Sequence, residues 1–178
     1  MAGEGTEDPS ERDTDSAERD EALGVAVITI SDTRSLENDE PSEAVVDAFE
    51  RAGHSIETRE RIGCAHDDVQ STVSRIVDRD DVDVVVTTGG TGVEPSDVTI
   101  EAVAPLLDKS LSAFGPLFTQ LAYERIGTRV VAGRTLAGLV DDVPVCCLPG
   151  NADATRLATT EILLPEIDHL VVEASEEE

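Results

Sequence analysis

The stretch VDVVVTTGGTGVEPSDVTIEA, Val82 to Ala102, is the most informative part of the chain, because a β-branched run leads into a glycine-rich turn and a helix start follows. Gly89, Gly90 and Gly92 permit positive φ angles and a close approach of the backbone to a ligand. Three threonines of the same turn add hydroxyl donors: Thr87, Thr88 and Thr91. The pattern is typical of a phosphate site, although a tight strand-to-helix connection without a ligand has the same composition.

Two common nucleotide sites do not fit this turn. A P-loop ends in glycine, lysine and serine or threonine, but the one lysine of the chain, Lys109, lies far outside the turn. A dinucleotide fingerprint follows the first strand of its sheet, and here the first strand leads through Asp32, Thr33 and Arg34 without a glycine. A Walker ATPase and a Rossmann dehydrogenase are therefore disfavoured.

Asp97 follows the last glycine of the turn by five residues. Its carboxylate could be a metal ligand, an acid/base group or a cap for the next helix. Because Thr99 can cap that helix, with Glu101 in its first turn, Asp97 is left freer for a ligand.

The composition indicates one domain with an aliphatic core and an anionic surface. Of the 178 residues 39% are apolar, but the aromatic residues are only three Phe and one Tyr, which disfavours base-stacking platforms. The formal net charge of -26 repels nucleic acids and anionic membranes, so neither is expected as a partner.

The ends of the chain are acidic. Residues 1–23 hold nine acids and two arginines and are predicted to be a disordered tail, without the features of a signal or transit peptide. The folded domain is predicted over residues 24–172, and residues 173–178 form a second acidic tail. Since no segment approaches the roughly 18 apolar residues of a membrane span, a cytoplasmic protein is predicted.

The cysteines and histidines indicate neither disulfides nor a zinc site. Cys146 and Cys147 are adjacent and Cys64 is remote, which predicts reduced thiols in or near strands. The three histidines are scattered along the chain.

Strands and helices are predicted to alternate along the domain. Apolar runs predict strands at 24–31, 55–62, 82–88 and 143–148. Helical periodicity predicts helices at 41–52, about 69–77, 99–108, 114–125 and 151–164, the last interrupted by Pro165. Residues 127–142 fit either a short hairpin or an irregular arm. The alternation predicts an α/β fold with three layers and a mostly parallel, doubly wound sheet.

In such a fold, ligands bind beyond the carboxyl ends of the strands. Both glycine turns, TTGGTG at 87–92 and LPGN at 148–151, lie at these ends and precede helix N-termini that favour anions. Ser31 and Asp32 end the first strand on the same side, where each is as well explained by a turn cap as by a ligand contact.

Several motifs together resemble the MoaB/Mog family of molybdenum-cofactor biosynthesis proteins. They are ISD at 30–32, GH at 53–54, TTGGTG at 87–92, DVTIEA at 97–102, FG at 114–115, IGT at 126–128, AGRTLAG at 132–138 and LPGN at 148–151. The resemblance runs from about residue 24 to 170. It implies a molybdopterin-binding-domain-like fold and an enzyme that transfers AMP from ATP to the phosphate of molybdopterin, with release of pyrophosphate. It further implies Mg²⁺, a homotrimer or hexamer, and a metal-insertion protein as a partner.

The resemblance also implies site residues. Asp97 corresponds to a family aspartate that positions metal and phosphate, and Asp67, with Asp68 as a rival, to a second catalytic aspartate. Substrate contacts are implied for three short segments and one arginine: Ser31 and Asp32; Thr88, Gly89, Gly90, Thr91 and Gly92; Pro149, Gly150 and Asn151; and Arg134.

The sequence departs from the family pattern on the expected pterin side. Gly115 is followed by Pro116, Phe118 by Thr119, and Gly133 precedes Arg134 where relatives often have serine. Arg129 or Arg134 is a candidate to hold a pterin phosphate in compensation, although an exposed arginine on a solvated face is common. The alternatives to an adenylyltransferase are a non-catalytic pterin carrier or scaffold and a nucleotide-binding hydrolase of the same fold.

The acidic excess and the single lysine predict adaptation to a salt-rich cytoplasm, because counterions screen the repulsion among the carboxylates. The fold should therefore gain stability between dilute buffer and molar KCl, as followed by circular dichroism during thermal unfolding. Equal stability at both ends of the salt series would contradict this hypothesis.

Overall fold

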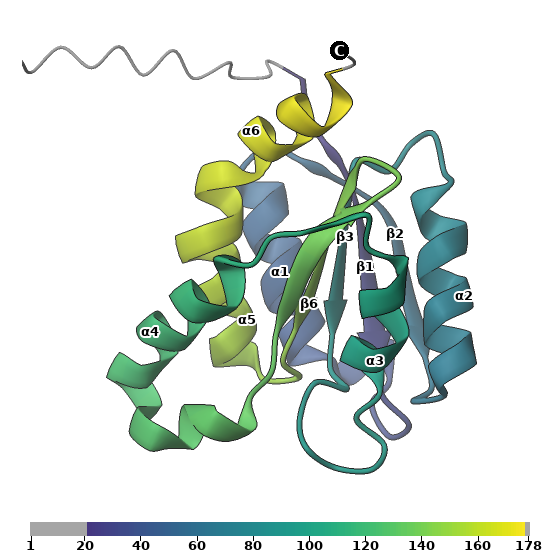
Figure 1. Ribbon diagram of the computed structural model, residues 1–178. Helices are drawn as coiled ribbons and strands as arrows, with labels where there is room; N and C mark the ends of the chain where they lie inside the picture. The colour runs from purple at the N-terminus through teal and green to yellow at the C-terminus, as the bar shows by residue number, and fades with distance from the viewer. Residues whose placement is uncertain (1–20, 177–178) are drawn as a thin grey trace, which may run out of the picture.

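The computed structural model describes residues 21–176, which form one mixed six-stranded sheet in the order β2-β1-β3-β6-β5-β4 (Figure 1). The parallel part consists of β1 (Gly24–Ile30), β2 (Ser55–Ile62), β3 (Val84–Thr88) and β6 (Val143–Leu148). At the other edge β5 (Leu136–Val140) and β4 (Lys109–Ser110) add antiparallel pairs. The predicted three-layer α/β fold with a mostly parallel sheet is confirmed.

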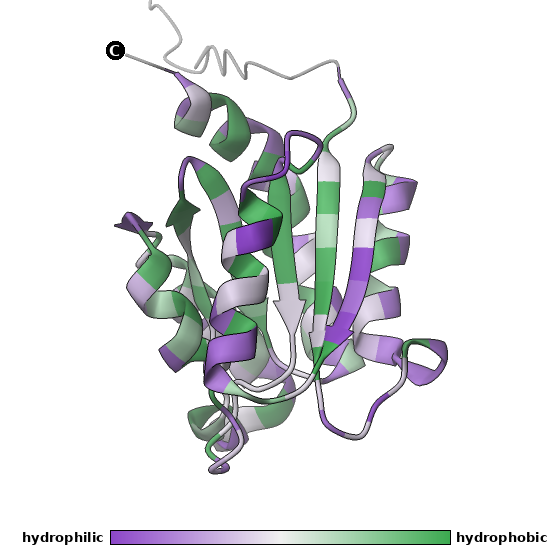
Figure 2. Cartoon of the chain, turned by 90° about the vertical axis from the view of Figure 1, so that its right-hand side faces the viewer, coloured by the Kyte–Doolittle hydropathy of each residue, from purple (hydrophilic) through white to green (hydrophobic). Residues whose placement is uncertain are grey.

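Helices cover both faces of the sheet. One face packs against α1 (Glu40–Arg51), α4 (Phe114–Ile126), α5 (Ala152–Ala158) and α6 (Leu164–Ser175), and the other against α2 (His66–Val77) and α3 (Thr99–Val103). Successive residues of β1 alternate between these two cores, with Val25 and Val27 in one and Ala26 and Ile28 in the other. The central strands are accordingly hydrophobic along their length, whereas the helices carry hydrophilic outer residues (Figure 2).

The segment 127–142, for which two conformations were open, contains both a helical turn and a hairpin strand. The 3-10 helix η3 (Gly127–Ala132) follows α4, and β5 then pairs with β6. The hairpin turns at Asp141 and Asp142, whose φ angles of 46° and 66° suit the tight turns that join twisted strands.

Two helix predictions need correction at prolines. The third helix ends at Val103 and a 3-10 turn, η2 (Ala104–Leu106), replaces its predicted last turn around Pro105. Pro165 does not interrupt the last helix. A π-helical segment, η4 (Thr159–Leu163), runs without a break into α6, and Pro165 lies just after it, where the wider turn accommodates a residue that cannot donate a helical hydrogen bond.

The domain extends slightly beyond its predicted limits. Leu23 is fully buried in the core, and α6 continues to Ser175, past the predicted end at residue 172. Most of the N-terminal tail predicted to be disordered, and the last two residues of the second acidic tail, lie outside the described residues, at 1–20 and 177–178. None of the helices in residues 21–176 is long and apolar enough to cross a membrane.

A buried carboxylate fixes the connection between β1 and α1. Asp39 is fully buried and accepts hydrogen bonds from the hydroxyl of Thr29 at the end of β1 and, at 3.2 Å, from the backbone amide of Ser42. Asp39 thereby caps α1 and holds the intervening loop, residues 31–38, against the edge where the parallel strands end.

Candidate functional site: a cleft between two glycine turns

A cleft of about 720 Å³ opens at the carboxyl ends of β1, β3 and β6, as the sequence predicted for a ligand site. Most of the predicted substrate contacts line it: Ser31, Asp32, Gly89, Gly90, Thr91, Gly92, Pro149, Gly150 and Asn151. Asp97 lines it as well, together with residues that the sequence patterns did not indicate as site residues, among them Arg34, Cys64 and Glu94.

The threonine-glycine turn packs so closely that side chains are excluded from it. Gly89 has a φ of 96°, and a Cβ atom there would lie 2.4 Å from the carbonyl oxygen of Ile30. Gly90 has a φ of 68°, and its Cβ would lie 2.2 Å from the Thr99 hydroxyl oxygen. Since the amide of Gly89 also donates to the Leu148 carbonyl at 3.0 Å, the turn is joined to the ends of both β1 and β6.

Backbone amides of this turn are available to a ligand. The N–H groups of Gly90, Thr91 and Gly92 donate to no residue within the described part of the chain. Consecutive amides that follow residues with positive φ form a concave arrangement that binds anions. The turn is therefore suited to phosphate through its own backbone.

The first amide of the helix that follows the turn, α3, is not available to a ligand, because it is already hydrogen-bonded within the protein. The amide of Thr99 donates to Gly90 O at 3.0 Å and its hydroxyl to Gly89 O at 2.9 Å, so the start of α3 is bonded to the turn. The predicted cap role of Thr99 is wrong, because Thr99 is the first residue of α3 and its side chain reaches backwards. At the other turn, the side chain of Asn151 caps α5 by accepting from the amide of Ala154 at 3.1 Å.

Asp97 is half-buried and has one oxygen available. Its Oδ2 accepts from the backbone amide of Glu94 at 2.9 Å, which closes the loop between the turn and α3. Its Oδ1 accepts no hydrogen bond from any described residue. A Cβ atom on Gly92 would lie 2.6 Å from Asp97 Oδ2, so a larger residue here would displace the carboxylate.

A second carboxylate of the cleft has the same arrangement. Asp32 Oδ1 accepts from the backbone amide of Cys64 at 2.9 Å, while its Oδ2 has no hydrogen-bond donor within residues 21–176. Burial, and after it the negative charges of Asp32 and Asp97, raise the pKa of the Cys64 thiol. The thiol therefore lies within the field of both carboxylates.

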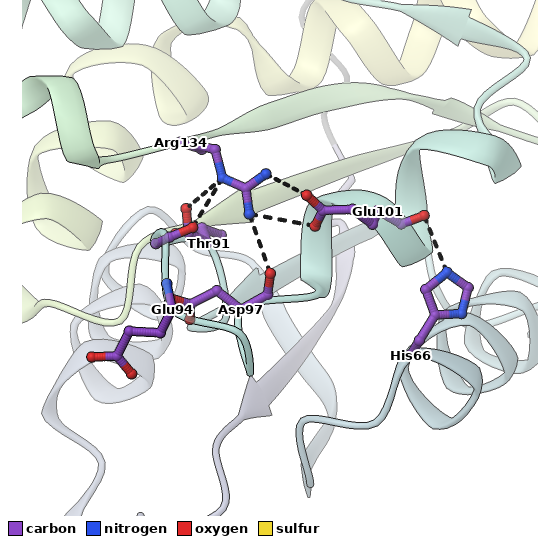
Figure 3. Close-up of polar contacts among 7 residues, drawn as sticks. His66, Thr91, Glu94, Asp97, Glu101 and Arg134 are labelled. Atoms are coloured by element: carbon purple, nitrogen blue, oxygen red, sulfur yellow. Dashed lines mark hydrogen bonds and ion pairs between the residues drawn. The ribbon is translucent and has the colours of Figure 1, made fainter.

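The structure does not bring Asp67 into this cleft. Its side chain is fully exposed at the start of α2 and pairs with His66 at 3.0 Å, and neither Asp67 nor Asp68 lines the cleft. The ring of His66 contacts the backbone carbonyl of Glu101 at 3.3 Å, away from Asp97 (Figure 3). The loop between β2 and α2 is short, and the residue that it presents to the cleft is Cys64.

Arg134 holds the turn from behind. Its guanidinium donates to the carbonyl oxygens of Gly92 at 3.0 Å and Asp97 at 3.2 Å, and it forms an ion pair with Glu101 (Figure 3). The hydrogen bond from Arg134 lowers the pKa of Glu101. Arg134 thus fixes the backbone of the turn, and its predicted substrate contact stays a prediction.

Ser31 and Thr88, two further predicted substrate contacts, differ in where the structure places them. Ser31 lines the cleft, and its hydroxyl oxygen accepts from the amides of Thr33 at 3.3 Å and Arg34 at 3.0 Å, so it also shapes its own loop. Thr88 is fully buried at the end of β3 and does not line the cleft.

A neighbouring cavity of about 740 Å³ lies beside α4, with mainly apolar atoms in its lining. It contains the positions at which the chain departs from the family pattern: Gly115, Pro116, Thr119 and Gly133, together with Tyr123 and Arg134. Gly133 lines both this cavity and the cleft, so the two are adjacent.

The predicted state of the other cysteines is confirmed. Cys146 and Cys147 are free and buried in β6, and burial raises the pKa of Cys147 to about 12. Cys64 is accordingly the thiol through which the cleft can be probed.

We expect alkylation of the folded protein to occur at Cys64, with a rate that rises with pH through an elevated pKa. Asp32→Asn keeps an acceptor for the Cys64 amide but removes the charge, so the pKa should fall and the profile should move to lower pH. Iodoacetamide labelling followed by mass spectrometry from about pH 7 to 10 measures this. Asp47→Asn, on the exposed side of α1, is the control, and an unmoved profile in Asp32→Asn would refute the electrostatic coupling.

Comparison with known proteins agrees with this geometry. Residues 26–169 match the family described as "Probable molybdopterin binding domain". The Molybdenum cofactor biosynthesis protein B of Bacillus cereus is 38% identical over 148 residues, which cover 83% of this chain and 88% of that protein. A crystal structure of a Molybdenum cofactor biosynthesis protein B has a TM-score of 0.85 and 35% identity, covering 88% of this chain and 98% of its own.

A third similar protein is described as the tungsten cofactor synthesizing protein MoaB from Pyrococcus furiosus. Its crystal structure has a TM-score of 0.78 and 30% identity, and covers 87% of this chain and 98% of its own. The matches span nearly the whole described domain, including both glycine turns. On these grounds the chain belongs to the MoaB/Mog family of molybdenum-cofactor biosynthesis proteins.

Proposed function

We propose that the chain is a cytoplasmic molybdopterin adenylyltransferase of molybdenum-cofactor biosynthesis, which transfers AMP from ATP to the phosphate of molybdopterin. The observation that carries the proposal is the cleft itself, in which free amides of residues 90–92 face two carboxylates that each keep one oxygen available. The resemblance to MoaB/Mog proteins suggests these two substrates, and the cleft offers groups that could bind their phosphates.

The reaction brings two anions together. A phosphate oxygen of molybdopterin forms a bond to the α-phosphorus of ATP, and the bond from that phosphorus to the bridging oxygen breaks, so that pyrophosphate leaves with the electron pair. The amides of Gly90, Thr91 and Gly92 would orient the nucleotide phosphates and stabilise the negative charge on their oxygens. The turn already holds these amides in place, so they would not have to reorient during the reaction. Glu94 and the two aspartates line the same cleft, so the carboxylates must be screened from these phosphates.

The carboxylates fit a divalent cation. Mg²⁺ is commonly held by one or two carboxylates together with substrate phosphates and water. Oδ1 of Asp97 and Oδ2 of Asp32 would be its protein ligands, because each carboxylate is fixed through its other oxygen by a backbone amide. When bound, the ion neutralises phosphate charge and polarises the P–O bonds. We propose Asp97 as the main metal ligand. Asp32, in place of the predicted Asp67, is proposed as the second acidic residue of the site.

The cavity beside α4 is the proposed site of the pterin. It adjoins the phosphate cleft at Gly133, and Tyr123 offers an aromatic face to a flat heterocycle. Since Arg134 is engaged by the turn, this cavity has few cationic groups to hold a pterin phosphate. That observation, with the position of Asp67 outside the cleft, favours a pterin carrier as the second candidate function.

We also propose assembly into a homotrimer or hexamer that delivers its product to a metal-insertion protein. Large apolar side chains are exposed on α4 and η3, among them Leu117 at 44%, Ile126 at 52% and Val131 at 86%. Surfaces of this kind are commonly covered by another protein. Light scattering in high salt should give a multiple of the 18.9 kDa chain, and a monomer would contradict the assembly.

The central test is adenylylation of molybdopterin by purified protein with ATP and Mg²⁺ in high salt. The wild type should release pyrophosphate and form the adenylylated pterin. Asp97→Asn should lower kcat by about 100-fold or more, because it removes a charged group that positions the metal and phosphate. The matched control, Asp47→Asn, changes an exposed aspartate of α1 and should retain wild-type kcat.

Three results would contradict the proposal in different ways. Tight pterin binding without product would support the carrier. Nucleotide hydrolysis without pterin binding would support a hydrolase of the same fold. Product formation at the wild-type rate in Asp97→Asn would support the proposed activity but refute the role of Asp97 in it.

A further inference from the structure

Arg34 lies where the two glycine turns meet. Its Nη2 donates to the carbonyl oxygen of Gly150 at 3.3 Å. A Cβ atom on Gly150 would lie 3.4 Å from Arg34 Nη1 and 3.2 Å from the Cα of Gly89. The guanidinium therefore lies close to the LPGN turn, near the point where that turn approaches Gly89, and lines the same cleft as residues 90–92.

The backbone at Arg34 is held in place while the side chain remains lightly engaged. The amide of Arg34 donates to the Ser31 hydroxyl oxygen at 3.0 Å, and the amide of Ser31 donates to Ile62 O at 3.0 Å. The contact to Gly150 is the one hydrogen bond that the guanidinium makes to a described residue, and at 3.3 Å it is long. An anion can replace it at small cost.

Arg34 differs from several other arginines in having no ion-pair partner among the described residues. Ion pairs with carboxylates engage four of them: Arg75, Arg79, Arg134 and Arg156. Arg34 has no such pair with a carboxylate in residues 21–176. It is also the one basic residue of that range in the lining of the cleft, where Asp32, Glu94 and Asp97 supply negative charge.

Acidic residues lie on the side of Arg34 that faces away from the cleft. Arg34 also lines an adjoining cavity of about 510 Å³ on the side of α1, and that cavity contains Glu37, Glu40 and Glu43. A polyanion that enters the cleft is attracted as far as Arg34 and repelled beyond it. Arg34 thus marks the end of the space that a chain of phosphates can occupy.

We propose that Arg34 binds the polyphosphate of the nucleotide, exchanging the Gly150 carbonyl for phosphate oxygens, and so favours triphosphate and pyrophosphate over a monophosphate. The planar guanidinium can donate two parallel hydrogen bonds to a phosphate, which an ammonium group cannot reproduce. The choice of a nucleotide as ligand rests on the proposed function. The recognition of linked phosphates rests on the position of Arg34.

The experiment is isothermal titration of the full chain in one fixed KCl concentration with Mg²⁺, using ATP, pyrophosphate and AMP as separate probes. Arg34→Gln should weaken ATP and pyrophosphate binding by about tenfold to a hundredfold, as expected for hydrogen bonds to a charged group, and change AMP binding by less than about twofold. Arg34→Lys should fall between wild type and Arg34→Gln. The matched control is Arg51→Gln, at the exposed opposite end of α1.

Each outcome decides for or against the inference. Wild-type affinity for ATP and pyrophosphate in Arg34→Gln overturns it, and so does an equal loss of AMP binding, which would indicate damage to the turn. Wild-type protein that binds none of the probes overturns it together with the proposed function. Binding that depends on Arg34 without adenylyl transfer would sustain the inference while the proposed function fails.

Discussion

The absence of side chains at four glycines is the constraint on which this site depends. Gly89, Gly90, Gly92 and Gly150 each occupy a position where a Cβ atom would approach backbone or a site side chain within 3.2 Å. These contacts allow the loops after β1, β3 and β6 to converge at the ends of adjacent parallel strands. A residue larger than glycine would displace a neighbour at each position, most severely at Gly89, where the Cβ atom would meet the backbone carbonyl oxygen of Ile30.

The same constraint suits a strongly acidic chain to the anion site that we propose. With a formal net charge of -26, this protein has few positive side chains to place in a phosphate site. Backbone amides of the threonine-glycine turn supply positive partial charge without a basic residue. Two arginines near the turn have different roles. Arg134 fixes the backbone of the turn from behind, whereas Arg34 lies in the lining of the cleft.

The sequence was sufficient for the fold and for the centre of the site. Period-2 and period-3.6 patterns located the parallel strands and most helices, and the spacing of Asp97 from the glycines correctly indicated that it lies in the same cleft. Sequence patterns could not determine which side of a loop faces the ligand. Asp67 was selected because it corresponds to a second family aspartate, but its side chain is exposed to solvent and the loop before α2 presents Cys64 to the cleft instead.

The arginines show the same limit. Arg134 lies in a family motif and was expected to contact substrate, yet three carbonyl oxygens and Glu101 engage its guanidinium from across the fold. Arg34 had no motif-based reason for selection beyond its place after Asp32. Its role depends on contact with Gly150, which is 116 residues away in the sequence and adjacent only in the folded chain.

The most direct measurement of the central claim is a crystal structure of the protein with Mg²⁺ and a non-hydrolysable ATP analogue. Phosphate oxygens should lie at the amides of Gly90, Thr91 and Gly92, with the metal against Asp97. Phosphates bound elsewhere, or an Asp97 carboxylate turned away from the metal, would contradict this claim.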